Sequence, residues 1–315
     1  MTPSLAVAIP TFRRNAGLEQ AIRSVFAQDH ATPFELIIAD NDPDGGAAEL
    51  ACRLADEAPV HIRVLYAHVP EPGVANARNA ALASTEARLI AFLDDDQSAS
   101  RGWLSALLRC HANFPAAATF GPIDTVLPES VTSHTAYFRQ FFCRMDGAGT
   151  GYIPRSYGCG NSLLDRDLIP QGEPVFDARM NESGGEDDVL FQRIREAGGQ
   201  FAWAADALAF EHVPAERARL GYTLKRAVSY GQGPIAHALR QSPINYATVA
   251  FWMAVGLYKF AVNVVAYAFL WAVRSDRRAD HLDKAARGAG KLVWWKRLNF
   301  YGAARLSGEG KPVLR

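Results

Sequence analysis

Length, composition and charge place the chain among ordinary globular proteins and exclude repeat and low-complexity architectures. The chain has 315 residues, 49% of them hydrophobic and 21% charged, enough for one large domain or two smaller ones with a sizeable core. The formal net charge is zero, but residues 1–216 carry 16 arginines and no lysine against 29 acidic residues, whereas residues 217–315 carry 17 basic against 4 acidic residues. The acidic part suits cations, and the basic part suits anionic phosphates or a membrane surface.

The cysteines argue against a zinc-binding or disulfide-rich protein. None of the four forms a C-x-x-C pair or lies near a histidine at zinc-ligand spacing, so we expect free thiols in a reducing compartment. No basic stretch followed by an apolar one marks the N-terminus, and we therefore expect no signal peptide.

Apolar runs and helical spacing alternate along the first 120 residues. The runs predict strands at 5–9, 34–39, 62–67, 89–93 and near Thr119, and the spacing predicts helices at 15–28, 46–57, 74–84 and 102–112. This alternation is typical of an α/β fold, a Rossmann-like and mostly parallel sheet with helices on both faces. Residues 122–157 are less regular, with scattered proline and glycine, and we expect a loop or lid there.

Three polar motifs directly follow predicted strands. They are Pro10-Thr11, Asp40-Asn41-Asp42 and Asp94-Asp95-Asp96. Because ligands of such sheets bind beyond the carboxyl ends of the strands, we expect the three motifs to meet on one rim.

The aspartate triplet 94–96 has the chemistry of a divalent cation site. Mn²⁺ or Mg²⁺ prefers one or two carboxylates together with phosphate and water oxygens. Asp94 and Asp96 would point to the same face of an extended strand end. The alternative is a solvated acidic turn.

A second acidic motif opens a predicted helix at 186–198. Glu186, Asp187 and Asp188 are candidates for a general base that takes a proton from an attacking hydroxyl group. The alternative is a helix start without catalytic function, since acidic residues in the first turn are favoured by the helix dipole.

Residues 246–273 are apolar except for Lys259 and Asn263, and are long enough to cross a bilayer at about 1.5 Å per residue. A central lysine costs roughly 2.5–3.5 kcal/mol on insertion scales. Residues 291–305 mix basic and aromatic side chains, which suits a membrane interface; they include Lys291, Val293, Trp294, Trp295, Lys296, Arg297, Phe300 and Arg305. A spanning helix, a helix in the membrane plane and a buried helix pair of a soluble fold all fit this pattern.

Taken together in their order, these motifs resemble the family 2 glycosyltransferases, which are inverting enzymes of the GT-A fold, and most of all the bacterial branch that builds exopolysaccharide and other surface glycans. The matching segments lie within residues 4–230 and are Val7–Arg14, Ile37–Asp42, Gly73–Asn79, Ile90–Asp96, Gly158–Ser162 and Gly185–Leu190.

The resemblance implies a role for each candidate residue. The nucleotide-sugar site would include Pro10, Thr11, Arg13, Asp40, Asp42, Arg78, Asn79, Asp94 and Asp95, with Asp40 on the base. The metal ligands would be Asp96, Asp94 and His212, the general base would be Asp187, and Glu186 would orient substrate. Because both acidic motifs are triplets, the assignment can shift by one residue. Asp188 is then an alternative general base, and Asp95 would contact the sugar instead of the metal.

These interpretations combine into one expected enzyme. Residues 1–230 would form a GT-A catalytic domain, and residues 231–315 a helical, membrane-associating region. The enzyme would transfer a sugar from a nucleotide-sugar donor, UDP-linked by default, to a glycan or lipid-linked acceptor at the inner face of the cell membrane, with Mn²⁺ or Mg²⁺ and without nucleic acid. A sugar nucleotidyltransferase and a non-catalytic glycan-binding or scaffold protein are the alternatives.

Overall fold

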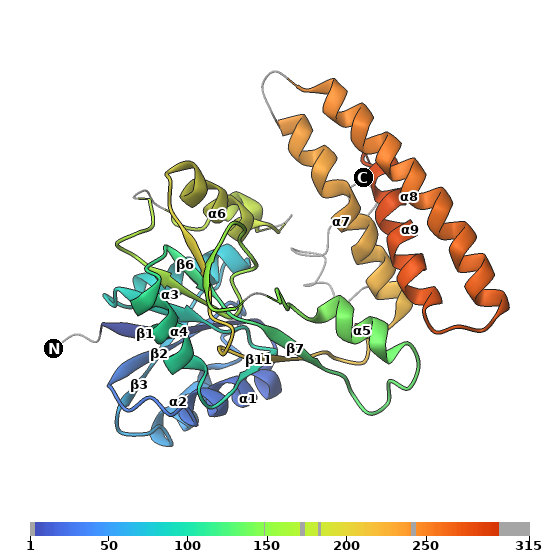
Figure 1. Cartoon of the computed structure of the whole chain (residues 1–315). Coiled ribbons are helices and arrows are strands. Elements are labelled where there is room, and N and C mark those ends of the chain that lie inside the picture. Colours follow the sequence, from blue (N-terminus) through green and yellow to red (C-terminus); the bar gives the residue numbers. More distant parts are fainter. Residues whose placement is uncertain (1–3, 148, 171–173, 182–183, 241–243, 296–315) are drawn as a thin grey trace. The chain divides into compact units, whose positions relative to one another are not determined.

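Two compact units make up the described part of the chain. The computed structural model describes residues 4–147, 149–170, 174–181, 184–240 and 244–295 (Figure 1). Of the described residues, the first unit comprises those up to Thr125 together with Cys143–His212, and the second comprises Val126–Phe142 together with those from Val213 to Trp295. The boundary expected at 230 and 231 falls inside a helix, and the division into a catalytic and a C-terminal domain stays a prediction.

An eight-stranded sheet is the frame of the first unit. Its order is β3-β2-β1-β4-β9-β6-β10-β8. The strands are β1 (Leu5–Thr11), β2 (Phe34–Asp40), β3 (Ile62–His68), β4 (Leu89–Phe92), β6 (Ala118–Phe120), β8 (Gly151–Ile153), β9 (Ser162–Asp165) and β10 (Phe201–Trp203). Strands β3, β2, β1 and β4 run parallel, as do β6 and β10. The mostly parallel sheet is therefore confirmed, with β9 and β8 added as antiparallel members.

Helices cover both faces of this sheet (Figure 1). Along β1, Leu5, Val7 and Ile9 belong to one buried cluster and the intervening alanines to another, because successive strand residues point to opposite faces. The first cluster includes residues of α1 (Asn15–Phe26), α2 (Ala48–Asp56) and α4 (Trp103–Asn113); the second includes residues of α3 (Val74–Ala83) and α6 (Glu186–Glu196). Burial on both faces explains why β1, β2 and β4 are continuous apolar runs.

A second, smaller sheet has the strand order β5-β11-β7, and its strand β5 follows the aspartate triplet at the end of β4. It consists of β5 (Gln97–Ala99), β11 (Ala209–His212) and β7 (Ile123–Val126), with β11 antiparallel to β5. This pairing lets the backbone N–H of His212 donate to the carbonyl of Asp96 at 2.8 Å. A short 3-10 helix, η1 (Ala178–Met180), precedes α6.

The second unit is helical. It contains α5 (Thr135–Phe142), α7 (Leu220–Arg240), α8 (Tyr246–Ala272) and α9 (Arg278–Leu292). Tyr137 and Phe138 of α5 form a buried cluster with Ala279 of α9. The expectation of a loop or lid at residues 122–157 is wrong, because this stretch contains β7, α5 and β8. A helix as short as α5 is stabilised by tertiary packing, which local sequence does not reveal.

The apolar run at 246–273 is a helix as predicted. Within the part of the chain that the structure describes, α8 is the single helix long and apolar enough to cross a membrane. Of the basic–aromatic segment 291–305, residues 291–295 are described, while Lys296, Arg297, Phe300 and Arg305 lie outside the described residues.

Candidate active site

The three strand-end motifs meet on one rim, as the sequence predicts. Thr11 is the register partner of Asp40 at the ends of β1 and β2. The Thr11 hydroxyl donates to Oδ2 of Asp95 at 3.0 Å, which ties the end of β1 to the turn after β4. The parallel register of β2, β1 and β4 causes this convergence, because it brings their carboxyl ends to the same edge.

Arg13 and Arg14 send their guanidinium groups in different directions. Arg13 has a φ of +54°, a left-handed conformation that is uncommon for a residue with a Cβ. Its side chain reaches Asp42 at 2.9 Å, whereas Arg14 reaches both Asp95 and Asp96 at 2.8 Å. The pair therefore links two of the strand-end motifs to the start of α1.

The three carboxylates of the triplet have different surroundings. Asp95 is buried, and it accepts from the Thr11 hydroxyl, the Phe12 backbone N–H and Arg14. The side chains of Asp94 and Asp96 keep 35% and 19% of their surface exposed. Burial and the nearby Asp94 carboxylate raise the pKa of Asp96 to about 6, against the opposing effect of Arg14. Asp94 and Asp96 are therefore the members of the triplet with room for a further partner.

These two carboxylates fit a divalent cation chemically. They offer hard oxygen ligands. Burial first, and the neighbouring Asp94 carboxylate second, raise the pKa of Asp96, and a bound cation would oppose both effects by stabilising the charged form. Among the described residues no group of three or more His, Cys, Asp and Glu side chains is arranged to hold a metal. A Mg²⁺-type site does not need one, because one or two carboxylates together with phosphate oxygens suffice.

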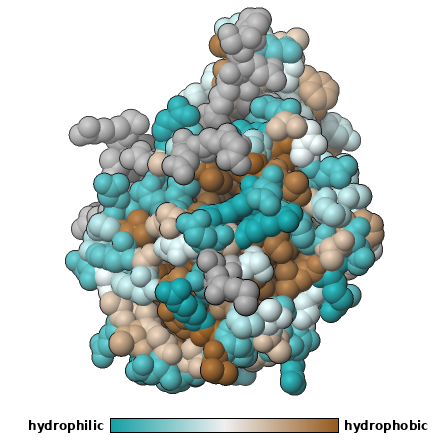
Figure 2. Space-filling model, turned by 90° about the vertical axis from the view of Figure 1, so that its left-hand side faces the viewer, coloured by the Kyte–Doolittle hydropathy of each residue, from teal (hydrophilic) through white to brown (hydrophobic). Residues whose placement is uncertain are grey.

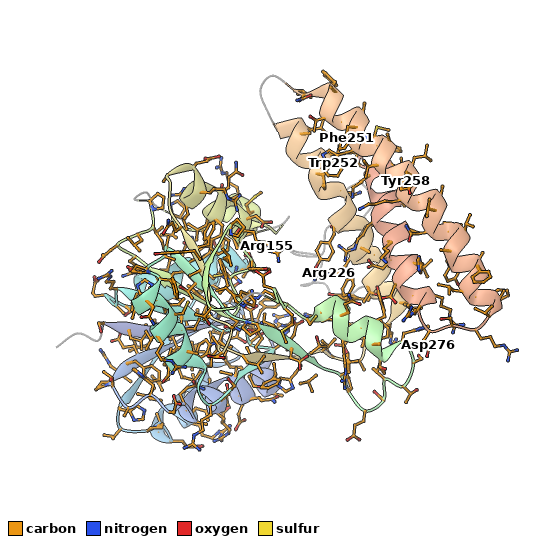
Figure 3. All side chains as sticks on the ribbon, viewed as in Figure 1. Arg155, Arg226, Phe251, Trp252, Tyr258 and Asp276 are labelled. Atoms are coloured by element: carbon orange, nitrogen blue, oxygen red, sulfur yellow. The ribbon has the colours of Figure 1, made fainter. Side chains whose placement is uncertain are left out.

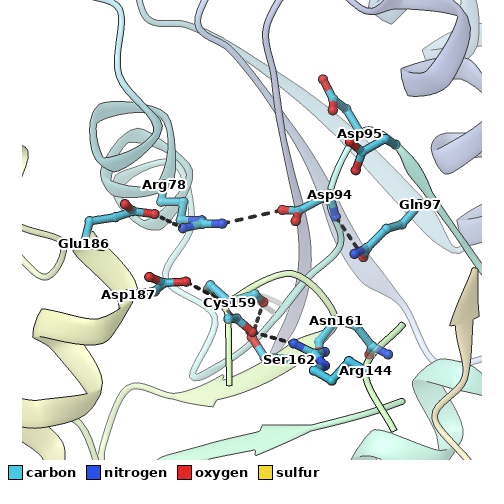
Figure 4. A network of polar contacts seen from close by, with 12 residues as sticks. Arg78, Asp94, Asp95, Gln97, Arg144, Cys159, Asn161, Ser162, Glu186 and Asp187 are labelled. Atoms are coloured by element: carbon cyan, nitrogen blue, oxygen red, sulfur yellow. Dashed lines mark hydrogen bonds and ion pairs between the residues drawn. The ribbon is translucent and has the colours of Figure 1, made fainter. Parts of the chain in front are cut away.

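Arg78 connects the two acidic motifs (Figure 4). Its guanidinium group donates to Glu186 at the start of α6, and lies 3.5 Å from Oδ1 of Asp94. Burial acts to lower the pKa of Arg78, but acidic neighbours that include Asp94 and Glu186 outweigh it and raise the pKa. The guanidinium group also lies over the Phe176 ring, 5.6 Å from its centroid, and its Nε atom is buried without a hydrogen-bond partner.

The three acidic residues at the start of α6 also differ in how far they are buried. Glu186 is buried in its ion pair with Arg78. Asp187 is partly exposed, and its Oδ2 accepts from the backbone N–H of Cys159 at 3.2 Å. Asp188 is exposed on the first turn of the helix. Asp187 is therefore the carboxylate of this motif that lies at the loop between the two motifs (Figure 4).

This loop, residues 158–161, closes the gap between Asp187 and Asp94. A Cβ atom at Gly160 would overlap the Asp94 carboxylate, so the close approach requires glycine. Arg144 holds the loop from behind by donating to the carbonyls of Gly158 at 2.7 Å and Asn161 at 2.6 Å. Asn161, with a φ of +55°, accepts from the indole N–H of Trp103 at 2.7 Å.

Four further predicted site residues also have side chains engaged with the protein itself. Asp40 is buried and accepts from the backbone N–H groups of Asp42 and Ala47 and from the Tyr66 hydroxyl. Asp42 pairs with Arg13. The Asn79 amide bonds both the N–H and the carbonyl of Phe176.

The fourth is His212, which lies beside Asp96 through its backbone. Its ring nitrogen Nε2 is 2.8 Å from the Ser98 hydroxyl and 2.9 Å from the Gln20 amide. Burial lowers the pKa of the ring, which favours the neutral form. Its role as a metal ligand stays a prediction.

Sequence reasoning did not single out Arg14, Arg144 and Asn161. Arg14 and Asn161 belong to the motifs that carry the family resemblance, so their position was a usable signal. Arg144 lies in the stretch expected to be irregular, and no local pattern marks it. Its partners are carbonyl groups of the loop, which only the folded chain brings within reach.

A Rossmann-like sheet binds its ligands beyond the carboxyl ends of its strands, and the acidic side chains described above are gathered at that edge. The fold and the site therefore define an α/β protein with an acidic ligand site, and comparison with known families gives its class. The chain matches the family described as "Glycosyl transferase family 2" over residues 6–171, more than half of its length, and it belongs to this family.

Relatives extend the similarity beyond the matched domain. The succinoglycan biosynthesis protein ExoM of Rhizobium meliloti is 30% identical over 318 residues, covering 97% of this chain and 98% of that protein. The pre-mycofactocin glycosyltransferase of Mycobacterium tuberculosis is 28% identical over 75% of this chain and 48% of its own length. The GalNAc(5)-diNAcBac-PP-undecaprenol beta-1,3-glucosyltransferase of Campylobacter jejuni is 30% identical over 38% of each chain.

Proposed function

We propose that the protein is an inverting, metal-dependent glycosyltransferase that elongates a bacterial surface glycan. The observation that carries the proposal is the Arg78 bridge, which couples Asp94 of one acidic motif to Glu186 of the other. A transferase needs a diphosphate site and a proton acceptor within reach of one sugar, and this bridge supports both on one rim. The donor is a nucleotide sugar, UDP-linked by default.

Asp94 and Asp96 would hold the cation, Mn²⁺ or Mg²⁺, with His212 beside them. When bound, the cation neutralises the charge that develops on the departing diphosphate. Arg78 adds a fixed positive charge next to Asp94, and Arg14 fixes the Asp96 carboxylate from the other side. Thr11, Arg13 and Asp40 would border the nucleoside.

Asp187 acts as the general base. A base must reach the acceptor hydroxyl and stay ionised, and Glu186 is committed to Arg78 whereas Asp187 is partly exposed beside the 158–161 loop. The oxygen of the acceptor attacks the anomeric carbon, the bond to the diphosphate breaks, and the hydroxyl proton passes to Asp187. Attack opposite the leaving group inverts the anomeric centre.

The acceptor is a glycan on a lipid carrier at the cytoplasmic face of the cell membrane. The names of two relatives support this, since one acts in succinoglycan biosynthesis and another on an undecaprenol-linked glycan. The apolar helix α8 supports attachment to a membrane.

A donor screen tests the proposal. The full-length protein is given UDP-, GDP- and dTDP-sugars with Mn²⁺, and release of the nucleotide is measured together with isothermal titration of the donor. Asp96→Ala should lose the metal-dependent part of donor binding. Asp187→Asn should bind donor normally and turn over about 10²–10⁴-fold more slowly.

Asp188→Asn is the matched control, because it removes a carboxylate from the same helical turn. If Asp187→Asn keeps near-normal turnover and Asp188→Asn does not, the assignment of the base is wrong. If no sugar nucleotide is bound or cleaved with Mn²⁺ or Mg²⁺, the proposed reaction itself is refuted.

A further inference from the structure

One face of α8 is apolar and open to solvent along the whole helix. Its members recur at helical spacing and carry no charged or amide group; they are Ala247, Ala250, Phe251, Ala254, Leu257, Tyr258, Ala261, Val262, Val265, Ala268, Phe269 and Ala272. We call this set the α8 stripe. Tyr258, Val265 and Phe269 keep 69%, 71% and 68% of their surface exposed. Figure 3 labels Phe251 and Tyr258 on this helix.

The α8 stripe differs from ordinary protein surface. Figure 2 shows a face of the molecule on which hydrophobic patches lie between hydrophilic side chains, as is normal for proteins in water. A contiguous apolar face about 40 Å long, at 1.5 Å per residue over the 27 residues of α8, is instead typical of a surface that meets another apolar phase.

The opposite face of α8 is packed against α9. A Cβ atom at Gly288 would lie 2.7 Å from the Phe260 nitrogen and 2.8 Å from the Gly256 carbonyl oxygen, so the two helices touch backbone to backbone. Farther along, Oδ1 of Asn263 lies 2.9 Å from Nδ1 of His281. Asn263 and Gly256 of α8 therefore belong to the α9 side, whereas Lys259 is exposed.

The partner helix α9 cannot enter the hydrocarbon core of a bilayer. Its 15 residues include six charged side chains, Arg278, Asp280, Asp283, Lys284, Arg287 and Lys291. Charged side chains within a membrane are strongly disfavoured, and those of α9 lie alongside the half of α8 that follows Gly256. As long as α8 and α9 stay packed, α8 cannot span the membrane, although its length alone would allow it.

We propose that α8 lies in the plane of an anionic phospholipid bilayer, with the α8 stripe at the boundary between headgroups and acyl chains and α9 on the aqueous side. Exposed Arg274 and Arg277, just beyond the end of α8, supply positive charge for anionic headgroups, and Trp271 (62% exposed) supplies an interfacial aromatic ring. This inference rests on the membrane attachment in the proposed function, and it adds the orientation of the helix.

Flotation of the full-length protein with vesicles tests the surface. Binding should be strong to an equal mixture of phosphatidylcholine and phosphatidylglycerol, weaker to phosphatidylcholine alone, and reduced by salt. Val265→Asp should lower the partition coefficient about tenfold or more, because it places a charge in the middle of the α8 stripe. Val60→Asp is the matched control, because Val60 is a fully exposed valine outside the stripe.

A depth measurement distinguishes the in-plane helix from a span. Single cysteines replace Phe251, Tyr258, Val265 and Phe269 in a Cys52→Ser/Cys143→Ser background, in which the remaining Cys110 and Cys159 are buried. Each introduced cysteine carries a fluorophore that is quenched by lipids with a nitroxide near the headgroup or near the chain end. The in-plane helix gives the same shallow depth at all four positions. A central label deeper than the end labels would mean a span and overturn the inference.

Failure of this inference is separable from failure of the proposed function. A protein that cleaves a nucleotide sugar but binds neither type of vesicle would refute the in-plane helix and leave the transfer reaction standing. A protein that binds vesicles at uniform shallow depth but cleaves no sugar nucleotide would refute the transfer reaction and leave the in-plane helix standing.

Discussion

The carboxylate of Asp94 is fixed by two unlike neighbours. Arg78 attracts it from one side at 3.5 Å. On the other side Gly160 leaves space that any larger residue would fill, since a Cβ atom there would overlap Oδ2 of Asp94. The direction in which Asp94 points is therefore set by steric exclusion as much as by charge.

Replacing Gly160 by alanine should move Asp94 without unfolding the protein. The atom in the way is the end of a side chain, so Asp94 can rotate aside at little cost in stability. We expect donor affinity in Mn²⁺ to fall by about tenfold, or about 1.4 kcal/mol, with little change in melting temperature. Titration calorimetry measures the affinity, and Gly149→Ala is the control, because nothing lies within 4 Å of that position. Unchanged affinity would contradict this view of Asp94.

The ion pair between Arg78 and Glu186 makes a second prediction at this scale. Both side chains are buried, so Arg78→Met leaves the Glu186 carboxylate without its partner. We expect a loss of about 3–5 kcal/mol in the free energy of unfolding, measured by urea denaturation. Adding Glu186→Gln should recover part of that loss, because it removes the unpaired charge. If the double variant is no more stable than Arg78→Met, desolvated charge is not the cause.

Individual site residues could be predicted where chemistry and strand ends coincide. Asp94, Asp96 and Asp187 were singled out because they directly follow an apolar strand or open a helix and belong to the motifs that carry the family resemblance. Their roles stay predictions, since an acidic turn and a helix start also occur for structural reasons alone. The pairing of Arg78 with Glu186 could not be predicted, since 108 positions separate them. Asp40 shows the converse: its place after β2 suggested a nucleoside contact, while the fold gives its oxygens three donors from its own loop and Tyr66.

At the scale of elements, the 158–161 loop depends on one arginine from a distant segment. Arg144 donates to the carbonyls of Gly121, Gly158 and Asn161. Burial lowers its pKa to about 10, so the guanidinium group is still charged at neutral pH. The planar guanidinium group spreads five N–H donors over a fixed fork and so reaches three separated carbonyls at once. A glutamine amide has two N–H donors, and the three of a lysine sit on one nitrogen atom.

Arg144→Gln should therefore loosen the loop. Each carbonyl left without a donor costs about 1–3 kcal/mol where it is buried, and Asp187 loses a well-placed partner in the Cys159 N–H. We expect a lower turnover number and a lower melting temperature, with the Michaelis constant for the donor changed less. Arg155→Gln is the control from the same part of the chain, because Arg155 (labelled in Figure 3) is exposed. It pairs with Asp146. If both substitutions change the turnover number and the melting temperature equally, Arg144 does not fix the 158–161 loop as inferred.

Whole elements were predicted best where the local pattern and the fold agree. The positions of β1 to β4 were anticipated. Strands β1, β2 and β4 are apolar runs because both faces of the sheet are covered there, whereas the edge strand β3 is partly exposed. Strand β9 was missed, because its four residues follow the 158–161 loop directly and it pairs antiparallel with β4 and β6, far away in sequence. Helix α5 was missed because its stability comes from partners more than 70 residues later.

At the scale of the molecule, the second unit is assembled from two separated segments. Helix α5 comes from the middle of the chain, and α7, α8 and α9 come from its end. Tyr137 links them: its ring is buried against Ala279, and its hydroxyl donates to Asp283 at 3.3 Å. The second unit therefore includes a segment from the middle of the chain, which the sequence pattern did not indicate.

A chain truncated after His212 should consequently fail to stay soluble. It keeps α5 but loses α7 and α9, so the apolar face of α5 becomes exposed; its aromatic members are Tyr137, Phe138, Phe141 and Phe142. Exposed clusters of this kind lead to aggregation. Replacing these four aromatics by serine in the truncated chain should raise the soluble yield several-fold, measured by centrifugation and size-exclusion chromatography. The same four substitutions in the full chain should lower the melting temperature, because there Tyr137 and Phe138 are buried and Phe141 and Phe142 partly buried. A truncated chain that is soluble and monomeric with its aromatics intact would show that α5 does not depend on the C-terminal helices for its cover.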